Sequence, residues 1–130
     1  LALRRDPGST EPEVQRLKDA LLGGDVVVTT GLVLQELLQG FSGPKARAQI
    51  IERFAALPLL QPDREDHVLA AELRNTCRRA GIQVGTIDAL LAQLCIRHDL
   101  TLLSTDRDFS LASRHCALRI WSPEAGTRRR

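Results

Sequence analysis

The chain contains 130 residues with a mass of 14.4 kDa, enough for one domain with a sizeable core and too little for two. Its composition is 43% hydrophobic, which excludes a wholly disordered chain. No apolar run approaches the roughly 18 residues of a membrane span, and the first residues lack the pattern of a secretion signal. We therefore expect a soluble, cytoplasmic protein with a single domain over residues 1–130, in which residues 122–130 form a mobile tail.

The net charge does not identify a class of partner, and the cysteine spacing indicates neither a metal site nor disulfide bonds. Eighteen basic and sixteen acidic residues give a net charge of +2, which does not by itself indicate a nucleic-acid binder. Only Lys18 and Lys45 are lysines, and arginine binds phosphate in a bidentate manner, although a codon bias explains the same composition. The spacing of Cys77, Cys95 and Cys116 fits neither a zinc finger nor a disulfide framework, so we expect buried free thiols.

The first helix and strand are predicted from a capping pattern and a β-branched run. Thr10-Glu11-Pro12-Glu13 is a capping box that predicts a helix ending at Gly23-Gly24. The apolar residues on its inner face are Val14, Leu17, Leu21 and Leu22. Residues 25–29 are typical of a buried parallel strand.

Two helices and an edge strand are expected next. Thr30 is suited to cap a helix over residues 32–39, and Pro44 starts another helix. The inner face of that second helix is predicted to consist of Ala48, Ile51, Phe54 and Ala55. Residues 57–60 are apolar, and the prolines at positions 58 and 62 predict that they form an edge strand.

The second half of the chain repeats this alternation. A long helix is predicted over residues 63–80, with Gly81 after it and an inner face of Val68, Leu69, Leu73, Cys77 and Ala80. Thr86 is expected to cap the next helix, whose inner residues are Ile87, Leu90, Leu91, Leu94 and Cys95. Strands are expected over residues 100–104 and 118–121. The pattern predicts an α/β fold, a three-layer α/β/α sandwich with a central, mainly parallel sheet.

Three segments carry carboxylates beside apolar sequence. Glu36 and Asp88 have no basic residue within helical reach, and Asp106 and Asp108 directly follow an apolar strand, with Arg107 as their only near cation. Each acid also has a structural explanation: a distant arginine partner for Glu36, a helix-start position for Asp88, and turn formation for the other two.

The three segments together favour a metal site. In parallel sheets, sites form at the carboxyl ends of the strands. Converging carboxylates would repel one another and pay a large desolvation cost unless a cation lay among them. A hard divalent ion such as Mg²⁺ prefers oxygen ligands, and beside a phosphodiester it activates water and neutralises developing charge.

Other chemistries fit the sequence less well. There is no GxGxxG, GxxxxGK[ST] or GxSxG motif. His67, His98 and His115 form no HExxH pattern, so we expect them at the surface or at helix ends. A phosphoacceptor receiver needs a lysine after a late strand, and neither Lys18 nor Lys45 has that position.

Residues 34–40 (LQELLQG), 86–92 (TIDALLA) and 102–109 (LLSTDRDF) resemble the PIN domain, in particular the VapC-type toxins of bacterial toxin–antitoxin pairs. The resemblance extends across nearly the whole chain. It implies a sandwich with the strand order 3-2-1-4-5 and a Mg²⁺- or Mn²⁺-dependent endoribonuclease. It also implies inhibition by a cognate antitoxin and, usually, a homodimer.

The resemblance assigns the site residues by position. Glu36, Asp88 and Asp106 would be the catalytic, metal-binding acids, and Asp108 would be a further one that is less constant in the family. Thr105 would be a polar neighbour of the site.

Arg107 stands between two of these acids and is assigned to contact with the RNA backbone, with a plain surface arginine as the alternative.

The chain departs from the family at its start. The family opens with a strand that ends in an aspartate, and residues 1–5 resemble the end of the helix that follows that strand. The strand, which would be central in the sheet, is absent from the 130 residues, and the chain contains no methionine. We expect the natural protein to contain both the strand and its aspartate.

Two function classes remain open. The first is the metal-dependent endoribonuclease toxin. The second is a catalytically inactive PIN-like module that binds RNA or protein, which the absent first aspartate favours. A DNA-directed nuclease of the same superfamily would need a helical arch or a further domain, for which the chain has no room.

Overall fold

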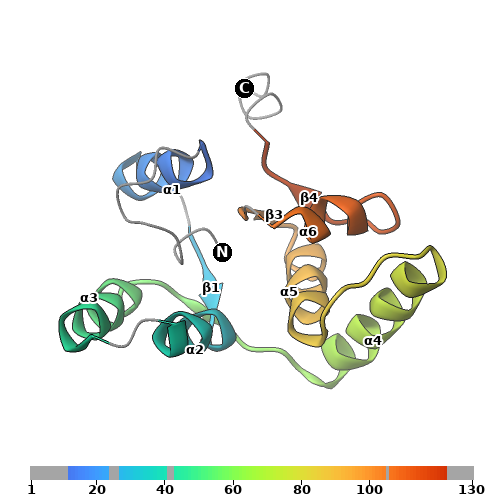
Figure 1. Cartoon of the computed structure of the whole chain (residues 1–130), viewed down its shortest axis with the longest axis horizontal. Helices are drawn as coiled ribbons and strands as arrows, with labels where there is room; N and C mark the ends of the chain where they lie inside the picture. Colours follow the sequence, from blue (N-terminus) through green and yellow to red (C-terminus); the bar gives the residue numbers. More distant parts are fainter. Residues whose placement is uncertain (1–11, 24–26, 41–42, 105, 123–130) are drawn as a thin grey trace. The chain divides into compact units, whose positions relative to one another are not determined.

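The computed structural model describes residues 12–23, 27–40, 43–104 and 106–122 (Figure 1). The chain divides into two compact units, residues 3–61 (unit 1) and residues 62–130 (unit 2), which are described separately. Among the described residues, no helix has the length and apolar character needed to cross a membrane.

Unit 1 contains three helices and one pair of parallel strands among its described residues. Its elements are α1 (Pro12–Gly23), β1 (Thr29–Thr30), α2 (Gly31–Gly40), α3 (Pro44–Phe54) and β2 (Leu59–Leu60). Thr29 lies opposite Leu59 and Thr30 opposite Leu60. The Thr29 N–H also donates to the Pro58 carbonyl at 3.1 Å, which extends the pairing by one residue.

The boundaries in unit 1 confirm the predicted helices and shorten the predicted strand. Thr30 caps α2 as expected, because its Oγ1 accepts a hydrogen bond from the Val33 N–H at 3.2 Å. Of the strand predicted over residues 25–29, residues 27 and 28 are described and are not in a strand, whereas Thr29 and the following Thr30 form β1. Thr10 and residues 24–26 lie outside the described residues.

The predicted inner faces of α1 and α3 were wrong in part. Phe54 is buried, but Ile51 is 44% exposed and Leu22 is 88% exposed. Ala48 and Ala55 are also exposed. Helical spacing identifies residues that share a face, but it does not show how far along that face a neighbouring element extends.

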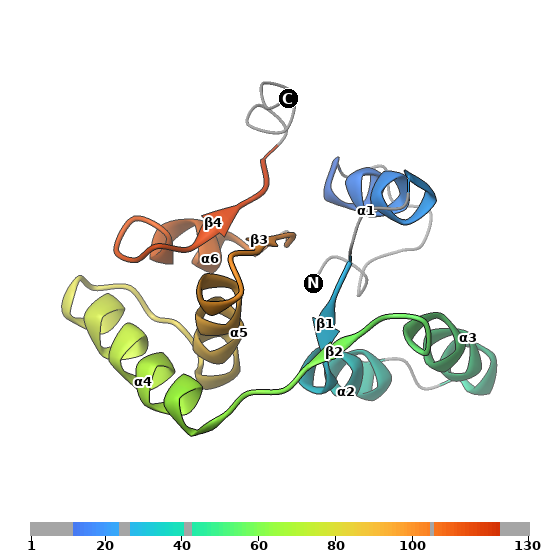
Figure 2. The same cartoon turned by 180° about the vertical axis from the view of Figure 1, so that it is seen from behind.

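Unit 2 contains α4 (Arg64–Arg79), α5 (Thr86–Arg97), β3 (Thr101–Leu102), α6 (Arg107–Ala112) and β4 (Arg119–Ile120). Helices α4 and α5 pack against each other, and both views of the ribbon show them side by side (Figures 1 and 2). Strands β3 and β4 are parallel, with Thr101 opposite Arg119 and Leu102 opposite Ile120.

The strand pairs agree with the expected α/β class. Each unit holds one pair of parallel strands, β1 with β2 and β3 with β4. The mainly parallel sheet predicted from the sequence is therefore confirmed at the level of these pairs.

Helix α5 forms the centre of the unit 2 core. Six consecutive residues, from Ala89 to Leu94, are buried, so the helix is covered on all sides there. Thr86 does not cap it as predicted, because Gly85 occupies the N-cap position and Thr86 is the first helical residue. Ile87 was predicted to face inward and is 37% exposed.

The buried face of α4 differs from the predicted one. It consists of Asp66, Ala70, Leu73 and Cys77, a set at helical spacing that begins with a charged residue. Val68 is 48% exposed and Ala80 is exposed as well. The prediction is therefore confirmed at Leu73 and Cys77 and wrong at Val68 and Ala80, and it did not include Asp66 because a hydrophobic pattern gives no weight to a charged residue.

Both ends of α4 are capped. Asp63 and Asp66 form a reciprocal capping box, with each side chain accepting from the other's backbone N–H at 2.9 Å. At the other end Gly81 has φ +84°, as the C-terminal glycine was expected to have. The N–H groups of Ile82 and Gly81 reach back to the carbonyls of Cys77 and Arg78, which completes a Schellman motif.

The carboxylate of Asp66 joins α4 to α5. Its side chain is fully buried and accepts hydrogen bonds from Gln93 Nε2 at 3.4 Å and from Arg97 Nη1. Arg97, which is 40% exposed, also lies 3.4 Å from Asp63. Burial raises the pKa of Asp66, but the hydrogen bonds from the Asp63 backbone, Gln93 and Arg97, together with the Arg97 charge, outweigh it and hold this pKa below 3.8.

This lowered pKa predicts a specific loss of stability in acid. Asp66 contributes stability that is complete above the unfolded pKa near 3.8 and is lost as the pH falls through the lower folded pKa. In Asp66→Asn the free energy of unfolding at pH 7 should fall by about 1–3 kcal/mol, and its decline below pH 4 should become shallower. Urea unfolding at a series of pH values measures both quantities.

The matched control is Asp99→Asn, which removes the same charge from an exposed aspartate that pairs with Arg119 at 2.9 Å. The free energy of unfolding of this control should fall in acid as steeply as that of the parent chain. If the free energy of unfolding of Asp66→Asn also fell in acid as steeply as that of the parent, the assigned role of Asp66 would be refuted.

Candidate active site

The start of α6 carries two aspartates held by local hydrogen bonds. After β3, the buried Ser104 accepts the Asp106 N–H on its Oγ at 3.0 Å. Asp106 is the N-cap of α6, and its Oδ1 accepts the Asp108 N–H at 2.9 Å. The segment therefore turns from strand to helix because a serine and an aspartate satisfy backbone groups that the turn leaves open.

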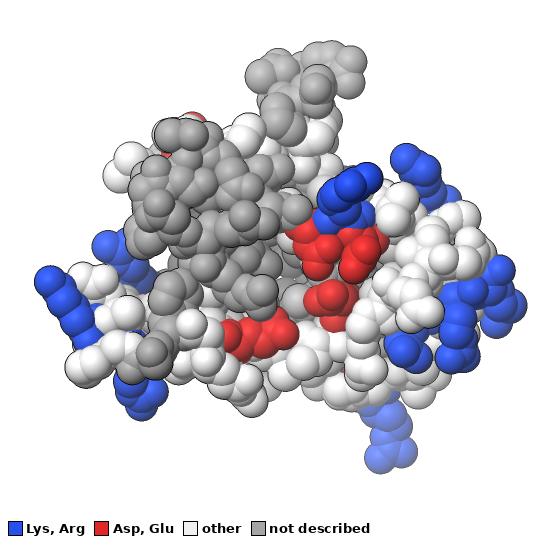
Figure 3. Space-filling view, in the orientation of Figure 1, with Lys and Arg blue, Asp and Glu red and all other residues white. Residues whose placement is uncertain are grey.

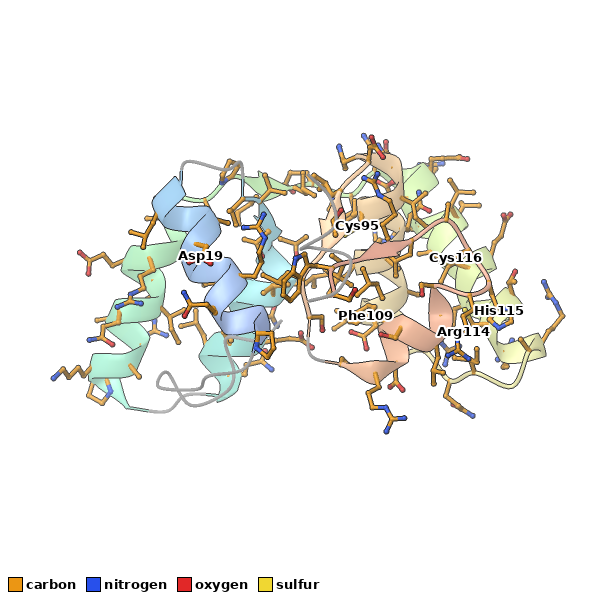
Figure 4. The ribbon with its side chains drawn as sticks, turned by 90° about the horizontal axis from the view of Figure 1, so that it is seen from above. Asp19, Cys95, Phe109, Arg114, His115 and Cys116 are labelled. Atoms are coloured by element: carbon orange, nitrogen blue, oxygen red, sulfur yellow. The ribbon has the colours of Figure 1, made fainter. Side chains whose placement is uncertain are left out.

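Phe109 fixes this turn to the core. It is 3% exposed, whereas Asp106, Arg107 and Asp108 are all exposed. Figure 4 labels Phe109 among the side chains of unit 2. A large buried ring directly after the two acids anchors the backbone while the carboxylates remain at the surface.

Asp88 lies in the first turn of α5 and is half-buried. Its Oδ2 is 3.9 Å from the position that a Cβ on Gly85 would occupy, so the carboxylate is turned back towards the N-terminus of its own helix. The N–H groups and the dipole at a helix N-terminus stabilise negative charge there. Figure 3 shows acidic side chains gathered on the face of unit 2 over α5 and α6.

Glu36 lies in the middle of α2, in unit 1, and is half-buried. Val33 and Leu37, on either side of it along the helix, are buried at 7% and 2% exposure. Within the described part of the chain, no ion pair involves Glu36, so the distant arginine considered as its partner is not found there.

The predicted site residues are thus distributed as follows. Asp106 and Asp108 lie together at the start of α6, Asp88 lies in the same unit at the start of α5, and Glu36 lies in the other unit. Thr105 falls outside the described residues. Across residues 12–23, 27–40, 43–104 and 106–122, no three His, Cys, Asp or Glu side chains lie close enough together to hold a metal ion.

The chemistry of the donors nevertheless fits a hard divalent ion. All four assigned acids supply carboxylate oxygens, which Mg²⁺ and Mn²⁺ prefer. Asp106 uses Oδ1 for its backbone hydrogen bond, which leaves Oδ2 as a possible ligand atom. Among the described ion pairs none joins Arg107 to Asp106 or Asp108, so neither carboxylate is neutralised by that neighbour.

Ser104 is a site-supporting residue that the sequence reasoning missed. Its hydroxyl orients the backbone of Asp106 and is buried below it. The available signal was a serine two residues before an aspartate at the end of a strand, a spacing typical of side-chain-to-backbone turns.

The cysteines and histidines do not form a competing nucleophilic site. Burial raises the pKa of Cys95 to about 11 and also raises that of the fully buried Cys77, so both thiols are protonated at neutral pH. All three cysteines are free, but only Cys77 is fully buried, and Cys95 and Cys116 are half-buried. The three histidines are exposed, as expected.

Comparison with known proteins bears on the family and the fold of the chain. The family model described as "PIN domain" matches residues 3–114. Among solved structures, the crystal structure of FitAcB from Neisseria gonorrhoeae is 20% identical and aligns over 90% of this chain and 88% of that chain, with a TM-score of 0.61. This likeness supports the fold. Since the family model covers most of the sequence, the chain belongs to the PIN-domain family, whose members are generally nucleases.

Proposed function

We propose that this protein is a metal-dependent endoribonuclease toxin of the VapC type, neutralised by a cognate antitoxin. The observation that carries the proposal is the aspartate pair at the start of α6, in the TDRDF segment of a chain that matches the PIN family over residues 3–114. The arrangement places two exposed carboxylates at the carboxyl end of a parallel strand, where sites of α/β proteins form.

The proposed metal ligands are Glu36, Asp88, Asp106 and Asp108, and the ion is Mg²⁺ or Mn²⁺. When bound, such an ion supplies an activated water and neutralises charge on the scissile phosphate.

The remaining residues position these acids. The N-terminus of α5 stabilises the charge of Asp88. Ser104 and the cap hydrogen bond fix Asp106, and Phe109 anchors the turn from below. The exposed Arg107, which lies between the two acids in the sequence, is proposed to bind an RNA phosphate, and Thr105 is proposed as a polar neighbour of the site.

The partners follow from the same motif resemblance. We propose an antitoxin partner, a homodimeric assembly and a cytoplasmic location, as is usual for VapC-type toxins.

A catalytically inactive RNA- or protein-binding module is the second candidate. The observation that favours it is that no three metal-ligating side chains are clustered among the described residues. In such a module, binding would be unaffected by EDTA and by substitution of the carboxylates.

Removal of the metal or of one ligand should abolish cleavage. We expect the antitoxin-free chain to cut structured RNAs at discrete positions in Mg²⁺ or Mn²⁺, and the cuts to disappear in EDTA and in Asp88→Asn. The melting temperature of this variant should be equal to or slightly lower than that of the parent, because the N-terminus of α5 loses a negative charge that it stabilises. Gel analysis of the RNA and thermal unfolding measure the two effects. Full activity of a folded Asp88→Asn protein would exclude Asp88 as a ligand.

Because Asp106 is the N-cap of α6, two substitutions can distinguish its role in helix stability from its proposed role in cleavage. Asparagine caps a helix about as well as aspartate, so Asp106→Asn should leave stability nearly unchanged, whereas Asp106→Ala should lose about 1 kcal/mol. Both variants should lose cleavage, because neither keeps the carboxylate. Unfolding in urea and an RNA cleavage assay, run on both proteins, distinguish the two effects. Normal cleavage by Asp106→Asn would show that the residue serves only as a cap.

A further inference from the structure

Two stretches of the unit 2 sequence contain basic residues and no acidic ones. Residues 73–87 and 109–122 contain no aspartate or glutamate. The basic residues in these two stretches are Arg74, Arg78, Arg79, Arg114, His115 and Arg119. Two of these arginines are already engaged, because Arg119 pairs with Asp99 at 2.9 Å and Arg74 donates to the Val84 carbonyl at 2.8 Å.

The two stretches lie next to each other in the folded unit. Both ribbon views place the loop between α6 and β4 beside the C-terminal end of α4 (Figures 1 and 2). Besides burial, the nearby Cys116 in this loop raises the pKa of Cys77 in α4. Arg114, His115 and Cys116 follow one another in the loop (Figure 4). Arg78, Arg79, Arg114 and His115 therefore form one basic surface, here named the α4–loop face.

The arginines of this face are held in place without being neutralised. Arg78 Nη2 donates to Asn75 Oδ1 at 2.7 Å, and Arg79 Nη2 donates to Thr76 Oγ1 at 3.2 Å. Each bond uses one of the five N–H donors of a guanidinium group and restricts the side chain before any ligand arrives. Among the described residues, no carboxylate forms an ion pair with Arg78, Arg79 or Arg114.

We propose that the α4–loop face binds the sugar–phosphate backbone of the RNA substrate, next to the segment that is cleaved. This inference rests on the proposed function. Helix α6 has six residues and is about 9 Å long at 1.5 Å per residue, with the aspartate pair at its start and the loop of the α4–loop face just after its end. A strand that crosses the aspartate pair can therefore reach the face within a few phosphates.

The composition of the face favours a polyanionic backbone over a protein partner. Protein interfaces have an apolar centre. The exposed large hydrophobic side chains among the described residues are Leu22, Ile51, Leu59, Val68, Ile87 and Leu111, and none of them lies in residues 73–80 or 113–118. Guanidinium groups without apolar neighbours match phosphate oxygens in geometry and charge.

The test measures RNA binding without cleavage. The full chain in EDTA is titrated into a fluorescein-labelled, single-stranded 20-nucleotide RNA at several salt concentrations, and anisotropy is recorded. The variant is Arg78→Gln/Arg79→Gln, and the matched control is Lys45→Gln/Arg47→Gln, which removes two exposed charges from α3. Circular dichroism verifies that both variants are folded.

We expect the α4 variant to bind RNA on the order of tenfold more weakly than the parent, and its log–log salt slope to decrease by about 1.4, as the loss of two phosphate contacts to a single strand requires. The control should keep the parent affinity. Equal affinity of the α4 variant and the parent, or an equal loss in the control, would overturn the proposal.

The two proposals fail in different ways. Binding that depends on Arg78 and Arg79, together with no cleavage in Mg²⁺ or Mn²⁺, would refute the nuclease and retain the binding face. Metal-dependent cleavage, together with an RNA affinity that does not depend on Arg78 and Arg79, would support the nuclease and refute the binding face.

Discussion

The buried carboxylate of Asp66 is the interaction on which the arrangement of unit 2 depends. It closes the capping box of α4 and at the same time receives Gln93 and Arg97 from α5. A carboxylate without these donors would be costly to bury, so packing of the two helices and satisfaction of this charge occur together. Because α5 carries Asp88 at its other end, the same contact fixes the helix that presents a proposed metal ligand.

Helix starts recur as the device that places charge in this protein. Asp63, Asp88 and Asp106 all lie at or within one turn of a helix N-terminus. At such positions backbone N–H groups stabilise an anion and hold its side chain at the same time. Asp106 can thus be both stable in the folded chain and available to a cation, since its backbone hydrogen bond uses only Oδ1.

Features that depend on neighbouring residues could be predicted from the sequence, whereas contacts between residues far apart in the chain could not. The cap at Thr30, the glycine after α4 and the parallel strand pairs all follow from residue type and spacing. No local pattern indicates that Asp66 is buried, because its partners Gln93 and Arg97 on α5 are about thirty positions away. The acids themselves were found from their apolar neighbours, but sequence gives only their identity, and their assembly around an ion depends on tertiary placement.

The protonated state of the cysteines has a consequence for selective labelling. Burial raises the pKa of Cys95 to about 11, so this thiol is protonated at neutral pH and reacts slowly with electrophiles. Cys77 is fully enclosed and its pKa is raised in the same direction. A maleimide dye should therefore react first with the half-buried Cys116, which adjoins Arg114 and His115. The natural sequence offers a position for a fluorescent reporter beside the basic surface without any engineered cysteine.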